Sequence, residues 1–217
     1  MGSRVWSGVR TGMLVACALS MASAFVACGG DDDGAETALS CSGAQCNLEC
    51  PAGTPDCNAT CSKGADCDLA CNDAACNLDC ASKSQCAADC RKVGGCDTSC
   101  EGQSTCNVDC TGTGDCNLDC AGGSNCNTQC QSNCGGGCSG TSSCELACES
   151  GCGLGCTGNA TCKVSCKTNC FVCCKGSGTC NLECTDSDVT QCAADDGTPI
   201  WVCGRECPKA GECKYVG

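Results

Sequence analysis

Histidine is absent from this chain of 217 residues, and aromatic residues are scarce, with two Trp, two Phe and one Tyr. Without histidine there is no His-based catalytic triad and no His-assisted metal site. Too few large apolar side chains are present to build an ordinary core, in which each contributes about 1.5–3 kcal/mol. Basic residues number 12 against 25 acidic ones, whereas nucleic-acid binding needs clustered Lys and Arg. We therefore expect neither an enzyme nor a nucleic-acid partner.

Cysteine is abundant instead, with 38 residues. A cysteine content above about 8–10% indicates a disulfide scaffold, and disulfides persist in oxidising compartments. Between Cys41 and Cys213 lie 36 cysteines, enough for 18 bridges. Cross-links are expected to replace the missing core, and the protein is expected to be exported.

Residues 1–27 have the composition of a signal peptide, with Arg4 and Arg10 before an apolar stretch that is too short to span a membrane. The stretch ends in Phe25-Val26-Ala27-Cys28 and is followed by glycine and aspartate. This sequence resembles the lipobox of bacterial lipoproteins, with Phe25 where Leu is usual. The resemblance implies cleavage before Cys28, acylation of that cysteine (palmitate included) and anchoring to a membrane.

Two alternatives exist for this leader. Leu14-Val15-Ala16-Cys17 is closer to the lipobox, but mostly apolar residues follow it. Cleavage after Ala22-Ser23-Ala24 would instead release a soluble, secreted protein. Cys28 is favoured because it is left over from the even set of 36 cysteines beyond it. Gly29, rather than Asp, follows Cys28, which by the same resemblance favours the outer membrane or cell surface.

Residues 28–45 carry a run of acidic residues without apolar periodicity and are expected to form a flexible acidic tether. Removing the leader leaves 10 basic and 25 acidic residues, a net charge of −15. Cations are therefore more plausible ligands than anions, although an acidic surface also serves solubility alone.

A repeat of about ten residues occupies residues 46–184. Its unit is Cys-x-x-x-Cys followed by a Gly-, Ser-, Thr- or Asn-rich connector typical of turns. Clear copies begin at Cys46, Cys67, Cys76, Cys106, Cys116 and Cys180.

Read as a strand, the unit places Cys, Leu and Cys on one face and Asn and Asp on the other. A strand and a turn every ten residues predict an all-β protein, a narrow β-solenoid with rungs of about ten residues; an irregular, small disulfide-rich fold is the alternative. The cysteine spacing resembles the disulfide-ribbed β-helix of insect hyperactive antifreeze proteins. That likeness concerns architecture and does not extend to a functional motif.

The spacing leaves the disulfide connectivity open. Bridges could join cysteines within one unit, such as Cys116 to Cys120, or link neighbouring rungs. We favour pairing across the turns, Cys110 with Cys116 and Cys120 with Cys126. Cysteines four residues apart on an extended strand are separated by about 13 Å, too far for a bridge.

Three connectors shorten to three residues, Gln131–Asn133, Glu149–Gly151 and Lys167–Asn169, where kinks or loss of strand order are expected. After Cys184 the repeat stops. Residues 185–217 are expected to form a C-terminal cap, because a solenoid needs an atypical unit to close its end. A separate ligand-binding module is the alternative.

Four acidic residues, Asp79, Asp89, Asp109 and Asp119, are expected to recur along one side of the rod as candidate Ca²⁺ ligands. A solvated acidic face is the simpler interpretation. Thiolate metal binding of the metallothionein type is a further alternative, although those proteins favour Cys-x-Cys clusters and a reducing compartment. The Cys-x-x-Cys segment Cys170–Cys173 has the spacing of a thiol oxidoreductase but lies among many structural cysteines.

The sequence thus favours a non-enzymatic envelope lipoprotein, a structural or adhesive rod whose partner is an unidentified surface or matrix polymer or protein. A Ca²⁺-responsive binding module is the second hypothesis. The chain also resembles uncharacterised Cys-rich repeat lipoproteins of myxobacterial type, and that resemblance implies no activity.

Overall fold

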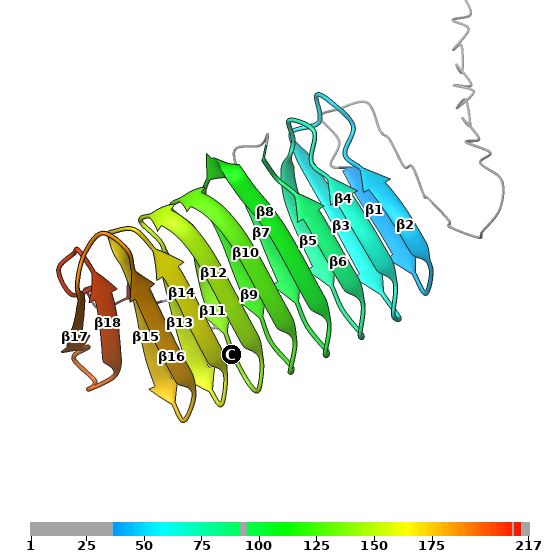
Figure 1. The fold of residues 1–217 in the computed structure, drawn as a ribbon. Helices are drawn as coiled ribbons and strands as arrows, with labels where there is room; N and C mark the ends of the chain where they lie inside the picture. The colour runs from blue at the N-terminus through cyan, green and yellow to red at the C-terminus, as the bar shows by residue number, and fades with distance from the viewer. Residues whose placement is uncertain (1–36, 92–94, 210, 214–217) are drawn as a thin grey trace, which may run out of the picture.

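The computed structural model describes residues 37–91, 95–209 and 211–213 (Figure 1). Within these ranges the chain forms 18 β-strands and no helix, and the strands build two sheets that run along the whole rod (Figure 1). No described segment is a helix long and apolar enough to cross a membrane. The prediction of an all-β, narrow solenoid is confirmed.

The strands alternate between two sheets along the chain. Sheet A has ten strands in the order β1 (Thr37–Ser42), β3 (Asp56–Ser62), β5 (Ala75–Cys80), β7 (Cys96–Cys100), β9 (Cys116–Cys120), β11 (Gly135–Cys138), β13 (Gly153–Gly158), β15 (Cys170–Gly176), β18 (Pro199–Cys203) and β17 (Val189–Ala193). Sheet B has eight in the order β2 (Gln45–Glu49), β4 (Asp66–Ala70), β6 (Gln85–Asp89), β8 (Thr105–Gly114), β10 (Asn125–Ser132), β12 (Ser143–Ser150), β14 (Thr161–Cys166) and β16 (Thr179–Cys184).

The length of a rung differs from the expected ten residues, because each repeat forms one strand and therefore half a rung. Each strand of the repeat pairs in parallel with the second strand after it, so Cys96 lies beside Cys116 and one rung takes 20 residues there. Two facing strands are needed because each strand has one apolar face, which is buried only against another apolar face. Strands β1 to β16 make eight such rungs.

Positions one, three and five of each repeat point into the rod, as β9 shows with its alternation of buried and exposed residues. Between the two inward cysteines lies a single small or medium-sized side chain, such as Leu118 or Thr128. A large inward side chain on one strand of a rung is matched by a small one on the facing strand, as with Leu69 and Ala59 or Leu146 and Gly136. A Cβ at Gly136 would lie 1.8 Å from the Leu118 carbonyl oxygen, so only glycine fits there.

The edge at which the chain passes from sheet A to sheet B (the A-to-B edge) holds a column of buried serines. From the second serine onward, the hydroxyl accepts a hydrogen bond from the backbone N–H of the serine one rung earlier: Ser104 Oγ from Ser84 at 3.2 Å, and Ser124 Oγ from Ser104 at 3.1 Å. The Ser104 hydroxyl also donates to the Glu101 carbonyl at 2.6 Å. These bonds satisfy turn backbone groups that burial removes from water.

At the opposite edge (the B-to-A edge), the three shortened connectors keep their strand order. From β10 onward a rung takes 18 residues, since Asn125 lies beside Ser143. A register shift between Cys130 and Ser132, where β10 pairs with β8, absorbs the change. Asn133 and Asn169 end two of these connectors in the left-handed conformation, with φ of 57° and 59°, which asparagine tolerates better than most residues.

Both ends of the solenoid differ from the simple repeat. The first strand, Thr37–Ser42, lies within residues 28–45, where a flexible tether was expected, and pairs in parallel with β3. At the other end β17 and β18 form an antiparallel hairpin, and β18 pairs antiparallel with β15 (Figure 1). The hairpin covers the edge of sheet A.

All 36 cysteines in the described part of the chain are paired, in 18 disulfides. Sixteen of these form two columns, one along each edge of the rod. The A-to-B column contains Cys41–Cys46, Cys61–Cys67, Cys80–Cys86, Cys100–Cys106, Cys120–Cys126, Cys138–Cys144, Cys156–Cys162 and Cys174–Cys180. The B-to-A column contains Cys50–Cys57, Cys71–Cys76, Cys90–Cys96, Cys110–Cys116, Cys130–Cys134, Cys148–Cys152, Cys166–Cys170 and Cys184–Cys203.

The remaining two disulfides, Cys173–Cys213 and Cys192–Cys207, hold the cap. The cap also completes the B-to-A column. Cys203 lies beside Cys170 on the neighbouring strand, the place that the first cysteine of a ninth rung would take. Each of the eight rungs is therefore cross-linked at both edges.

Candidate functional site on the outer faces

The four candidate calcium ligands lie in different sheets. Asp79 and Asp119 belong to β5 and β9 of sheet A, whereas Asp89 and Asp109 belong to β6 and β8 of sheet B. The expected single acidic column is therefore corrected to two separate pairs. Consecutive repeats alternate between the sheets, so a column of ten-residue period is divided between opposite faces.

On sheet B, Asp89 and Asp109 are adjacent and share one basic partner, Arg91. The Arg91 guanidinium donates to both oxygens of Asp89, at 2.8 and 2.5 Å, and lies 3.6 Å from Asp109. The hydrogen bond to Asp89 and the charges of both carboxylates raise the pKa of Arg91. Asp109 also accepts from the Thr111 hydroxyl at 2.7 Å. Arg91 neutralises one of the two carboxylate charges, and a Ca²⁺ ion would have to compete with it.

A groove of about 550 Å³ runs along the outer face of sheet B. It crosses five rungs, from β2 to β10, between two rows of outward side chains. Ala70 and Ala87 leave it hollow, whereas Asn107, Asn127 and Gln129 supply amide groups. Polar groups therefore recur along the groove at the strand spacing of about 4.8 Å, which suits an extended ligand with a short repeat.

Beyond β10, ion pairs join neighbouring rungs on the outer face of sheet B and at its B-to-A edge. Lys163 Nζ lies 3.0 Å from Glu145 Oε1, and Lys167 Nζ lies 2.7 Å from Glu149 Oε1. The hydrogen bond to its glutamate raises the pKa of each lysine. All four side chains are about half exposed, so these pairs contribute little stability.

The outer face of sheet A has a second groove, of about 440 Å³, whose polar lining side chains are carboxylates, hydroxyls and amides. Asp79, Ser99 and Asp119 follow one another in register, so the two carboxylates are two strands apart, about 9.6 Å. In the other row of outward side chains, Asn117 Nδ2 of β9 donates to Asp97 Oδ1 of the neighbouring strand β7 at 2.8 Å. Of the two faces, this one has the donor set closer to what Ca²⁺ prefers.

The cysteines of the described residues offer no thiolate, because each is in a disulfide. Cys110 is joined to Cys116 with a Cα–Cα distance of 6.6 Å, and Cys120 to Cys126 with 6.3 Å. The Cys-x-x-Cys segment is not a dithiol pair, since Cys170 binds Cys166 and Cys173 binds Cys213. The predicted lipidation site, Cys28, lies outside the described residues.

Sequence reasoning missed two features of these faces. Arg91 stands in a connector, and its pairing with two rungs at once follows only from their stacking. The two grooves depend on which repeats are neighbours, which a period of ten does not specify. No protein-family model, curated protein or solved structure matches this chain.

Proposed function

We propose that this protein is a non-enzymatic, lipid-anchored rod of the cell envelope that presents two polar, repetitive faces to a surface or matrix polymer. The observation that carries the proposal is the cross-linking of every rung at both edges. A disulfide restricts the unfolded chain and contributes about 2–4 kcal/mol where its loop is long enough. So dense a set indicates folding in an oxidising compartment and a shape that survives outside the cell.

The groove on sheet B supports an extended partner. Its amide side chains both donate and accept hydrogen bonds, carboxylates and Arg91 lie among them, and the groove continues over five rungs. Polar, repetitive surfaces favour many weak contacts in series, so affinity grows with the length of the ligand. This property suits adhesion or matrix attachment better than capture of one small molecule.

Anchoring is tested by metabolic labelling with an alkyne analogue of palmitate in a Gram-negative host. We expect Cys28→Ser to abolish labelling and to release the protein into the soluble fraction. Cys17→Ser is the matched control and should keep the label. Loss of label in Cys17→Ser instead, or in neither variant, would refute anchoring at Cys28.

The rod is tested by force spectroscopy on the oxidised and the fully reduced protein. In the oxidised rod each turn disulfide, such as Cys120–Cys126, withholds the connector that it closes, so a repeat extends only through its strand and the bridge. The total extension under force should therefore be clearly shorter than after reduction. Full reduction should release the whole repeat region as one long extension. Equal extension in both states would overturn the mechanical role.

Calcium is the second candidate, and the oxygen-lined groove of sheet A is what favours it. Calorimetry at millimolar Ca²⁺ separates the two functions. Binding heat that disappears in Asp79→Asn/Asp119→Asn, but persists in Asp89→Asn/Asp109→Asn, would support a Ca²⁺-responsive face. Absence of heat in the unmodified protein removes this candidate and leaves the rod proposal intact.

A further inference from the structure

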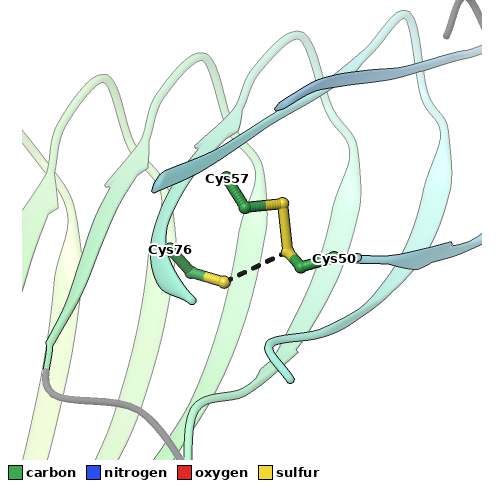
Figure 2. Close-up of side chains that lie close together, drawn as sticks. All are labelled: Cys50, Cys57 and Cys76. Atoms are coloured by element: carbon green, nitrogen blue, oxygen red, sulfur yellow. Dashed lines mark hydrogen bonds between the residues drawn. A yellow bond between two sulfur atoms is a disulfide. The ribbon is translucent and has the colours of Figure 1, made fainter. Parts of the chain in front are cut away.

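Disulfides of successive rungs are in contact within the B-to-A column. Cys50 Sγ lies 3.4 Å from Cys76 Sγ, which belongs to the disulfide of the next rung (Figure 2). The same contact recurs between Cys71 and Cys90 at 3.7 Å. Because all these sulfurs are in disulfides and carry no proton, the contacts are sulfur–sulfur contacts rather than hydrogen bonds.

Close sulfur groups occur along both columns. In each group, both sulfurs of one disulfide and one sulfur of the adjacent disulfide in the same column lie within 4.8 Å of one another. All three cysteines are buried. Examples are Cys50, Cys57 and Cys76 and also Cys71, Cys90 and Cys96 in the B-to-A column, and Cys80, Cys100 and Cys106 in the A-to-B column.

Such contacts have a chemical consequence once a single thiol appears in the column. A thiolate attacks a disulfide sulfur, forms a new bond and expels the other sulfur as a thiolate. The Cys50–Cys76 contact lies within the range of about 3–3.5 Å from which such a reaction proceeds, and the contacts of 3.7 Å lie just beyond it. We propose that the B-to-A column is an exchange relay, along which a thiol generated in one rung moves to the next.

One step of the relay can be written for the contact in Figure 2. An external dithiol first reduces a partly exposed disulfide of the column and is itself oxidised to a disulfide, and exchange along the column then leaves Cys76 as a thiolate. The Cys76 thiolate then attacks Cys50 Sγ, a Cys50–Cys76 bond forms, the Cys50–Cys57 bond breaks, and Cys57 leaves as the thiolate. This exchange is neutral in electrons, and the number of disulfides stays constant. Cys71 attacks Cys90 in the same way and expels Cys96.

The B-to-A column has two partly exposed cysteines. Most of its cysteines are buried, as Cys50 at 0% and Cys130 at 4% are, so an external thiol cannot approach these directly. Cys148, in the middle of the column, is partly exposed and is paired with Cys152. Cys184, in the last disulfide of the column, is partly exposed. Attack there releases Cys203, which lies beside Cys170. A reducing equivalent therefore enters at the cap or at Cys148–Cys152 and reaches the buried rungs by exchange.

The relay is tested in the oxidised full-length protein with the variant Cys71→Ser, which leaves Cys76 as the one thiol of its rung. After incubation at pH 8.5, acid quenching, maleimide labelling and peptide mapping, we expect label on Cys57 as well as on Cys76. A Cys50–Cys76 linked peptide should accompany it, and exchange should be faster at higher pH because the thiolate is the attacking form. Label confined to Cys76 would overturn the proposal.

The matched control is Cys192→Ser, which leaves Cys207, an exposed cysteine outside both columns; its label should stay on Cys207. Where Cys71→Ser does not fold, the wild-type protein is treated with a substoichiometric dithiol. We then expect linkages between rungs, such as Cys50–Cys76, Cys71–Cys90 and Cys148–Cys170, the last pair being 3.7 Å apart. If only native disulfides are found and the free thiols occur only as both members of a native pair, the relay is refuted. The rod proposal does not depend on this result.

Discussion

Cys173 and Cys174 are adjacent in the chain, yet their side chains leave β15 on opposite faces of sheet A. Cys174 closes the last rung with Cys180, whereas Cys173 binds Cys213, 40 residues further along. Successive side chains of a strand alternate between faces, so neighbouring cysteines cannot both enter the interior. The outward disulfide holds the end of the cap against the outer face of the rod.

Removing that bond in Cys173→Ser/Cys213→Ser should loosen the cap alone. A 40-residue loop corresponds to about 4 kcal/mol, and less is expected here because Cys184–Cys203 already closes part of it. Hydrogen exchange should accelerate in residues 189–213, and trypsin should cleave faster after Lys209. Exchange in β2 to β14 serves as the internal control. Unchanged exchange in the cap would show that the bond contributes nothing to its order.

Ser104→Ala tests the buried serine column. The substitution removes the acceptor for the Ser84 N–H and leaves that buried donor without its partner, at a cost of about 1–3 kcal/mol. We expect a lower Tm and faster exchange of the Ser84 amide. Ser143→Ala, at an exposed position of β12, is the control and should change neither. An unaltered Ser84 amide in Ser104→Ala would contradict the role of the column.

Thr128→Val should stabilise the rod. The Thr128 side chain is 2% exposed, and its hydroxyl has no hydrogen-bond partner, so the isosteric methyl removes a desolvation cost of about 1 kcal/mol or more. A higher Tm is the expected result by calorimetry. The same change at the exposed Thr161 of β14 controls for strand propensity. If both variants shift Tm equally, the buried hydroxyl carries no cost.

The contact between Arg205 and Glu212 should titrate in acid. Arg205 Nη2 lies 2.6 Å from Glu212 Oε2, and this hydrogen bond lowers the pKa of Glu212 below its ordinary value of 4.5. A lowered pKa in the folded state means that the contact stabilises the cap fully above pH 4.5 and ceases to do so as the pH falls through the folded value.

Carboxyl NMR of Glu212 measures this midpoint directly. Arg205→Met removes the guanidinium, which also stacks on the Phe171 ring at 4.8 Å, and should raise the midpoint toward 4.5. A midpoint that is identical in the two proteins would contradict the hydrogen bond.

Much of the fold could be predicted because the cysteine spacing is so regular. In Cys116-Asn117-Leu118-Asp119-Cys120 the alternation of apolar and polar residues determines which side chains face inward, and the structure buries Cys116, Leu118 and Cys120. The connectors carry turn residues at a constant interval, which predicts a solenoid. The end of the repeat at Cys184 coincides with the end of β16.

The number of strands in a rung could not be predicted in the same way. Alternation along a strand states which face is buried but not which strand lies beside it. β2 pairs with β4 rather than with β3, and this pairing divides Asp79 and Asp89 between opposite faces. The disulfide pairings of the cap could not be predicted either, because Cys184, Cys192 and Cys203 follow no constant spacing.

The sequence alone determined the strand, the turn, the inward cysteines and the dependence on an oxidising compartment, since these follow from side-chain alternation and composition over a few residues. The tertiary structure decided which repeats are neighbours, and with them the two grooves, the Arg91 contacts and the sulfur contacts between rungs. Those features join residues about 20 positions apart, as Cys57 and Cys76 are in adjacent strands. Such neighbours are set by the closing of two sheets around one interior, which no local pattern encodes.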